Sequence, residues 1–201
     1  MNIKKQLTTS NITSAVLLGL LLALIFIPSF KGTVMQVLLK TGLFSPDVPT
    51  GHSGELATAF AANSETGDIL FKNPQGHVIE LGEQKGKVVF LNFWATWCPP
   101  CIAEMPSIQK FYDKFRDNPQ ILFVLVDVDN QRAKAEKFMR RHEFTLPVYT
   151  PAGPVPASYM DGAIPTTLIL NKYGQVVFKH EGMGDYSGDE FQAFIHQLIN
   201  E

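Results

Sequence analysis

The chain has 201 residues, of which 45% are hydrophobic and 18% are charged, and its formal net charge is −2. This length suffices for one domain with a hydrophobic core and one additional segment. The nearly neutral charge lacks the basic excess of nucleic-acid-binding domains, so nothing in the composition supports nucleic-acid binding.

A long apolar segment lies near the N-terminus. Residues 12–30 carry no charge, and Lys4 and Lys5 precede them. As a helix, this segment would be about 28 Å long, close to the thickness of the bilayer hydrocarbon. We predict a single transmembrane signal anchor at 12–30 in the cytoplasmic membrane, with residues 1–11 in the cytoplasm and the remainder at the periplasmic or outer face. A cleaved signal peptide is the alternative, but the segment ends in the sequence PSFK, a poor cleavage site.

Proline and glycine residues separate this anchor from a globular domain. Residues 31–66 include Pro46, Pro49 and Gly51, and we predict a juxtamembrane segment and linker there, followed by a domain at 67–201. Turn residues, apolar runs and helical periodicity predict its elements in chain order: a hairpin at 69–81, a buried strand at 88–94, a helix to about 116, a buried strand at 121–128, a helix at 132–142, a hairpin at 166–179, and a last helix opened by a capping box at 187–190.

The order of these elements favours one fold class. Strands and helices alternate first, and an antiparallel hairpin and a helix close the domain, which predicts an α/β fold with a mixed sheet flanked by helices. The segment 146–162, with four prolines and two glycines, is assigned to no element.

The only two cysteines, Cys98 and Cys101, follow the strand at 88–94. We expect Cys98 at the N-cap of the next helix, where backbone N–H groups and the helix dipole favour its thiolate. Thiolates attack disulfides, so Cys98 is the expected nucleophile and Cys101 the resolving thiol of a redox-active disulfide. Pro99 fits the first helical position, and Pro100 removes a donor, which leaves the Cys101 N–H nearest to the Cys98 sulfur.

Other roles for the cysteines have less support. Two inert buried cysteines remain an alternative. Zinc would require further ligands, and covalent haem attachment would require a histidine where Ile102 stands, so we expect neither a metal nor a cofactor. The carboxylates of Asp127 and Asp129 could bind a metal, but we expect Asp129 to cap the helix that follows.

The segment 93–106, with the sequence FWATWCPPCIAEMP, resembles the active-site segment of thioredoxin-fold proteins. It is most similar to that of membrane-anchored TlpA/ResA/DsbE-like thiol-disulfide oxidoreductases, and the resemblance extends from about Asp68 to the C-terminus. It implies a thioredoxin-like fold, a central mixed sheet flanked by helices with an added N-terminal hairpin, and an extracytoplasmic location.

The resemblance also implies a substrate groove. The residues around Pro165 resemble the family's cis-proline loop, which faces the dithiol, although an ordinary trans proline before a strand is the alternative. The groove would be lined by Trp97, Pro99, Pro100, Ile164 and Thr166.

A carboxyl group near the cysteines is a further candidate. Thioredoxin itself has a buried aspartate at the position of Asn92, whereas a glutamate at the position of Glu104 takes its role in the TlpA/ResA-like branch. We hypothesise that Glu104 is partly buried, titrates near neutrality and accepts the proton of Cys101. The alternative is a solvated helix glutamate, or one favoured by the helix N-terminus.

The two prolines between the cysteines, without added positive charge, predict a mildly lowered Cys98 pKa and a reducing site. The resemblance implies that the substrates are disulfide-containing exported proteins, apocytochrome c among the candidates, and that a membrane protein passes reducing equivalents outward to the site. The alternatives are an oxidising or isomerising exchange partner and a non-catalytic chaperone or scaffold. A peroxidase is disfavoured because Ala95 replaces the threonine that thioredoxin-fold peroxidases need.

Overall fold

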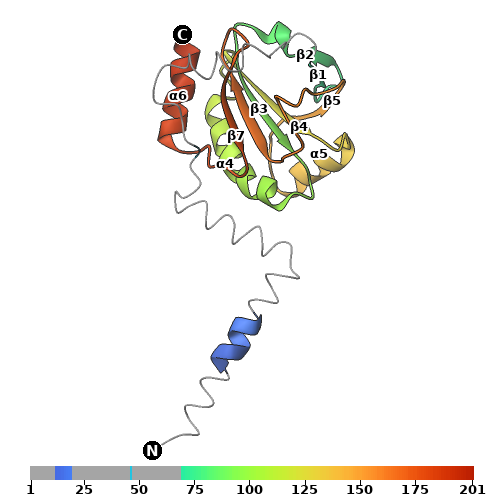
Figure 1. Ribbon diagram of the computed structural model, residues 1–201, viewed down its shortest axis with the longest axis vertical. Helices are drawn as coiled ribbons and strands as arrows, with labels where there is room; N and C mark the ends of the chain where they lie inside the picture. The colour runs from blue at the N-terminus through green and yellow to red at the C-terminus, as the bar shows by residue number, and fades with distance from the viewer. Residues whose placement is uncertain (1–11, 20–45, 47–68) are drawn as a thin grey trace, which may run out of the picture.

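The computed structural model describes residues 12–19, 46 and 69–201 (Figure 1). Residues 12–19 form an exposed helix. Most of the predicted anchor at 12–30, all of segment 1–11 and nearly all of segment 31–66 lie outside the described residues. In the part of the chain that the structure describes, no helix combines the length and the apolar character that a membrane span requires.

Residues 69–201 are built around a seven-stranded mixed sheet with the order β2-β1-β5-β4-β3-β6-β7. The central strands β3, β4 and β5 are parallel, and β6, β7 and the N-terminal hairpin β1–β2 are antiparallel to their neighbours. The predicted mixed sheet is confirmed. The strands are β1 (Leu70–Lys72), β2 (Val78–Glu80), β3 (Val88–Trp94), β4 (Ile121–Asp127), β5 (Val148–Pro151), β6 (Thr166–Leu170) and β7 (Val176–Glu181).

The helices cover one face of this sheet. They are α4 (Pro99–Phe115), α5 (Arg132–Arg141) and α6 (Asp189–Asn200), and a short 3₁₀ turn, η2 (Gly82–Gln84), precedes β3. Side chains alternate across a strand, so Phe90 and Trp94 of β3 pack with the three helices. Leu91 and Phe93 point to the opposite face, where they belong to a second buried cluster that includes residues of β1 and β5 and Tyr159.

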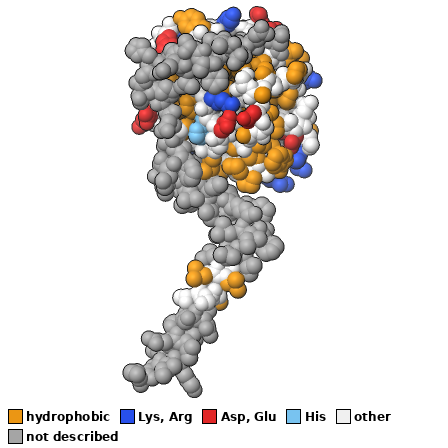
Figure 2. Space-filling view, viewed as in Figure 1, with side chains coloured by type: hydrophobic (Ala, Val, Ile, Leu, Met, Phe, Trp, Pro, Cys, Tyr) orange, Lys and Arg blue, Asp and Glu red, His pale blue; other side chains and the backbone are white. Residues whose placement is uncertain are grey.

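An aromatic cluster fixes α4 and α6 against the sheet. The ring of Phe90 lies 5.4 Å from those of Phe111 and Tyr186, and 6.4 Å from that of Phe191. Such pairs stabilise a fold by about 0.5–1.5 kcal/mol each beyond the burial of their area. The outer surface is more mixed than this aromatic cluster. Figure 2 shows side chains of both charges scattered among hydrophobic ones on the visible face.

Two sequence-based expectations about these elements need correction. The unassigned segment 146–162 contains β5, which pairs in parallel with β4 and antiparallel with β1. The predicted capping box at 187–190 is wrong, since Gly188 is the N-cap of α6 and no side chain caps the helix. The Ser187 hydroxyl, which was expected to cap the helix, instead donates to Asp185 Oδ1 at 2.7 Å.

Candidate active site

The two cysteines lie where β3 passes into α4, as predicted. β3 is buried along its whole length, and Cys98 is the N-cap of α4. Its Sγ accepts a hydrogen bond from the Cys101 backbone N–H at 3.2 Å, while Pro99 and Pro100 have no N–H to offer. The N-cap position also places this sulfur at the positive end of the helix dipole, which stabilises negative charge.

Cys98 and Cys101 form a disulfide, with their Cα atoms 5.3 Å apart. Cys98 is 3% exposed, whereas Cys101 is fully buried. The Cys98 sulfur is therefore the one that an approaching thiol or disulfide meets first.

The loop before β6 faces this disulfide. The Ile164–Pro165 bond is cis, as expected, and the Ile164 carbonyl oxygen lies 3.8 Å from Cys98 Sγ. The two loops meet because β3 and β6 are neighbours and Phe93 pairs with Thr166. The Thr166 hydroxyl donates to the Ala163 carbonyl oxygen at 2.8 Å, which holds the loop in shape.

The residues predicted to line a groove differ in exposure. Trp97 is 59% exposed, Pro99 is exposed, and Pro100 and Ile164 are half-buried. Thr166 is fully buried, so its side chain shapes the loop and is not available to a partner.

An aspartate holds the exposed tryptophan. The Trp97 Nε1–H donates to Asp129 Oδ2 at 2.7 Å. The expectation that Asp129 caps α5 is wrong, because the N-cap Gln131 is bonded instead to Asp127, whose Oδ2 accepts its backbone N–H at 2.7 Å. No group of metal-ligating side chains forms around these aspartates within the described residues.

Glu104 lies behind the disulfide and is fully buried, so the alternative of a solvated helix glutamate is wrong. Its Oε1 accepts the Asn92 Nδ2–H at 2.9 Å and its Oε2 accepts the Gly184 backbone N–H at 3.1 Å. Burial raises the pKa of Glu104 to about 8, and the two hydrogen bonds oppose this rise only in part. The carboxyl group therefore changes its protonation state near pH 8.

This carboxyl group belongs to a buried polar cluster. Asn92 pairs with Thr167 across β3 and β6, and its Nδ2 also donates to Thr167 Oγ1 at 2.9 Å. The hydroxyl of Tyr186 donates to the same oxygen at 2.8 Å. Burial, and then the charge of Glu104, raise the pKa of Tyr186 well above its ordinary value. Tyr186 thus stays neutral and able to donate.

Sequence reasoning missed three members of this cluster. They are Thr167, Gly184 and Tyr186, and no motif marks them. Thr167 lies 75 residues from its partner Asn92, and Gly184 lies 80 residues from its partner Glu104. Only Thr167 had a usable signal, because it follows by two residues the proline of the loop that was expected to face the dithiol.

The arrangement can alternate between a closed disulfide and two thiols. One sulfur is reachable and stabilised as a thiolate, the second lies within bonding distance, and a group able to take a proton lies on the same helix. These are the properties of a thiol-disulfide oxidoreductase with a thioredoxin-like fold.

Comparison with known proteins identifies the family of the chain. Residues 52–191 match the Redoxin family, and the chain belongs to this family. It is 32% identical over 136 residues to the thiol-disulfide oxidoreductase ResA of Halalkalibacterium halodurans, which covers 67% of this chain and 77% of the relative. It is 35% identical over 120 residues to the ResA of Geobacillus kaustophilus, covering 59% of this chain and 68% of the relative.

Solved structures agree with this assignment. A DsbE-type thiol:disulfide interchange protein of Chlorobium tepidum superposes with a TM-score of 0.56 and 26% identity, over 67% of this chain and 94% of that one. A thiol-disulfide oxidoreductase of Bacteroides vulgatus gives a TM-score of 0.53 and 25% identity, over 64% of this chain and 90% of that one. The protein is thus a thiol-disulfide oxidoreductase of the TlpA/ResA/DsbE-like kind.

Proposed function

We propose that this oxidoreductase is anchored in the cytoplasmic membrane by residues 12–30 and reduces disulfides of exported proteins at the outer face, with apocytochrome c as one candidate substrate. The observation that carries the direction of electron flow is the N-cap of α4. The Cys98 sulfur accepts the Cys101 N–H, and two prolines withhold the neighbouring donors. A thiolate with such modest stabilisation gives up its electrons readily, which favours reduction of a partner.

The exchange proceeds in two displacements. The Cys98 thiolate attacks one sulfur of the substrate disulfide, so that a Cys98–substrate disulfide forms and the other substrate sulfur leaves as a thiolate. The Cys101 thiol loses its proton and attacks Cys98 Sγ, which releases the second substrate thiolate and closes the Cys98–Cys101 disulfide. Two electrons pass to the substrate, and a membrane electron donor restores the two thiols by the reverse exchange.

Glu104 receives the proton of Cys101 in the second displacement. It lies three residues beyond Cys101, and residues at this spacing are neighbours on a helix surface. Its pKa of about 8 is close to the ordinary pKa of a thiol, about 8.5, so the transfer needs little free energy. Asn92 and Gly184 hold the carboxyl group in place by donating to its two oxygens.

The loop around Pro165 provides the surface for the partner chain. The Ile164 carbonyl oxygen lies next to Cys98 Sγ, and Pro165 has no N–H that would bond within the loop. An extended partner can therefore lie between this loop and the exposed side chains of Trp97 and Pro99.

Substrate reduction and trapping test the proposal together. The reduced full chain should reduce insulin disulfides with turnover, and Cys98→Ser should abolish this. Because the chain has only two cysteines, Cys101→Ser leaves Cys98 as the single attachment point and should accumulate mixed disulfides with exported proteins. Intact folding without any exchange would instead support a chaperone or scaffold.

The direction and the location have separate tests. In a glutathione buffer rich in the reduced form, a reducing site should stay largely in the disulfide form, whereas an oxidising site would become reduced. In intact spheroplasts of an expressing bacterium, a membrane-impermeant maleimide should label Cys98 after reduction. Labelling that requires permeabilised membranes would contradict an outward-facing domain.

A further inference from the structure

Helix α5 carries two faces of different charge. On one face, Glu136 Oε1 lies 2.7 Å from Arg132 Nε and its Oε2 lies 4.0 Å from Arg140 Nη1. Glu136 is the only acidic residue between Arg132 and Arg141, so these two ion pairs occupy the only negative charge of the helix.

The other face carries three cations that form no ion pair within residues 69–201. Lys134, Lys137 and Arg141 follow one another at spacings of three and four residues, which places them in one row on the helix. All three are exposed. The chain as a whole has a net charge of −2, so this row opposes the overall charge of the protein.

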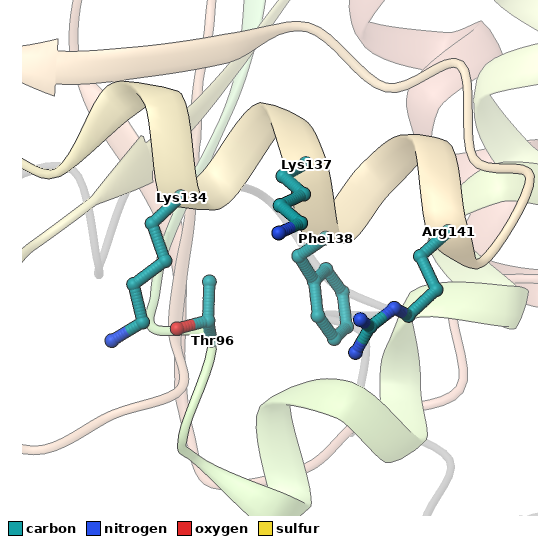
Figure 3. A pocket seen from close by; sticks show the side chains of 5 residues that line it. All are labelled: Thr96, Lys134, Lys137, Phe138 and Arg141. Atoms are coloured by element: carbon teal, nitrogen blue, oxygen red, sulfur yellow. The ribbon is translucent and has the colours of Figure 1, made fainter.

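The row borders a pocket beside the active-site loop. The pocket has a volume of about 280 Å³ and is lined by the three cations, Phe138 and Thr96 (Figure 3). The ring of Phe138 packs 5.5 Å from that of Trp94, which gives the pocket a firm apolar wall. Thr96 Oγ1 is buried and has no hydrogen-bond partner among the described residues, an unfavourable state that an added acceptor could relieve.

This pocket is close to the reacting sulfur. Thr96 precedes Cys98 by two residues, so their Cα atoms are at most about 7 Å apart. Two carboxylates lie at this end of β4: Asp127 accepts the Gln131 N–H and interacts with the charge of Lys134, and Asp129 accepts the Trp97 indole N–H. Neither forms an ion pair with the three cations, so the ammonium and guanidinium groups can still bind a partner that approaches Cys98.

We propose that this pocket binds the carboxylates of an acidic segment in the partner protein whose disulfide is exchanged at Cys98. The inference rests on the proposed exchange with protein substrates and adds the chemistry by which a partner is selected. The row from 134 to 141 is about 10 Å long, which is the length of about three residues of extended chain. It therefore fits two carboxylates in alternate or nearby positions of a peptide better than a single small anion.

Paired peptides test this preference. Two peptides of equal length contain the same disulfide, flanked on both sides by Glu pairs in one and by Gln pairs in the other. At low salt the reduced full chain should exchange with the acidic peptide about tenfold faster, because attraction between opposite charges raises association rates by roughly 10–10³-fold. The difference should shrink in 0.5 M NaCl, where charges are screened within a few ångströms.

A matched pair of variants assigns the effect to the pocket. The variant Lys134→Gln/Lys137→Gln/Arg141→Gln should exchange with both peptides at the rate that the neutral peptide shows with the unmodified chain. The control Lys85→Gln/Lys87→Gln/Lys110→Gln removes the same charge from three other exposed residues, two of which lie before β3, at the opposite end of that strand from Cys98. Equal rates for the two peptides in the unmodified chain, or equal losses in both variants, would overturn the proposal.

Binding without exchange separates this inference from the proposed function. Fluorescent forms of the peptides with serine in place of cysteine can bind but cannot react. Stronger binding of the acidic form, lost only in the pocket variant, would support the pocket even if no disulfide were reduced. If the acidic form bound no better than the neutral one, or if millimolar inorganic phosphate displaced it completely, a protein carboxylate would not be the ligand.

Discussion

The two sides of the Cys98–Cys101 disulfide are built in opposite ways. Behind it, Asn92, Glu104 and Tyr186 are fully buried. Asn92 donates to Glu104 and to Thr167, and Tyr186 donates to Thr167. In front of it, Trp97 is 59% exposed and is held by one hydrogen bond to an aspartate. Buried polar groups shift pKa values and affect stability, whereas exposed groups do little for stability but meet a partner. The back of the site is thus suited to proton transfer, and the front is suited to contact with a partner.

The largest effect expected from the back is a dependence of stability on pH. The folded protein keeps the proton on Glu104 up to about pH 8, while the unfolded chain releases it near the ordinary glutamate pKa of 4.5. Unfolding therefore releases a proton between these values, and stability falls as pH rises through this window. A shift of this size corresponds to on the order of 5 kcal/mol, and little further loss from this group is expected above pH 8.

Denaturant unfolding of the oxidised protein at pH 5 and pH 8.5 measures this dependence, and Glu104→Gln is the control. The variant should lose most of the slope. Burial also raises the pKa of Asp127, so any contribution of that group to the slope has the same sign and is kept in the variant. If the unmodified protein were equally stable at both pH values, a raised pKa for Glu104 would be contradicted.

The next effect concerns the rate of exchange. Glu104→Gln keeps the size of the side chain but cannot take a proton, and removal of a general base lowers rates by about 10²-fold or more. The rate of release from the Cys98 mixed disulfide should rise with pH through about 8 in the unmodified protein, because only the carboxylate form accepts the proton. Stopped-flow measurement from pH 6 to 9.5 should show this limb disappear in the variant, and an unchanged profile would remove Glu104 from the mechanism.

The sequence predicted the elements whose signals are local and missed those that depend on distant pairing. β3 and α4 were predictable because their signals are local: a continuous apolar run, an N-cap position and a proline at the first helical position. The short strand β5 was not, because Pro147 precedes it, Pro151 ends it, and its pairing comes from β4 and β1, which are separate segments of the sequence.

The candidate site shows the same limit. The cysteines and the proline loop follow from motifs, and the cis bond of Pro165 is confirmed. The full burial of Glu104 and the role of Tyr186 depend on how α4 and the segment before α6 pack on the sheet. The prediction that Asp129 caps α5 was wrong, because nothing local shows that the indole of Trp97 reaches Asp129.

A smaller effect is expected at the far end of the buried cluster. Tyr186→Phe removes the hydroxyl that donates to Thr167 but leaves both hydrogen bonds of Glu104 intact. The loss of one buried hydrogen bond should lower the free energy of unfolding by about 1 kcal/mol. The pH limb near 8 should stay in place, since Tyr186 does not contact the carboxyl group directly. A displacement of the limb by more than one pH unit would make Tyr186 a positioning residue for Glu104.

The smallest effect on stability is expected at the front. Trp97→Phe removes an exposed indole and its hydrogen bond to Asp129, and substitutions at such sites change stability by about 0.5 kcal/mol or less. The change should appear in recognition, as a several-fold rise in KM for a protein disulfide at an unchanged rate of release from the mixed disulfide, because tryptophan contributes strongly to protein contacts. Asp129→Asn offers a matched control, since its amide oxygen can still accept the indole N–H. If Trp97→Phe destabilised the fold by more than Tyr186→Phe, Trp97 would be a structural residue. The division of the site into a buried back for proton transfer and an exposed front for partner binding would then be wrong.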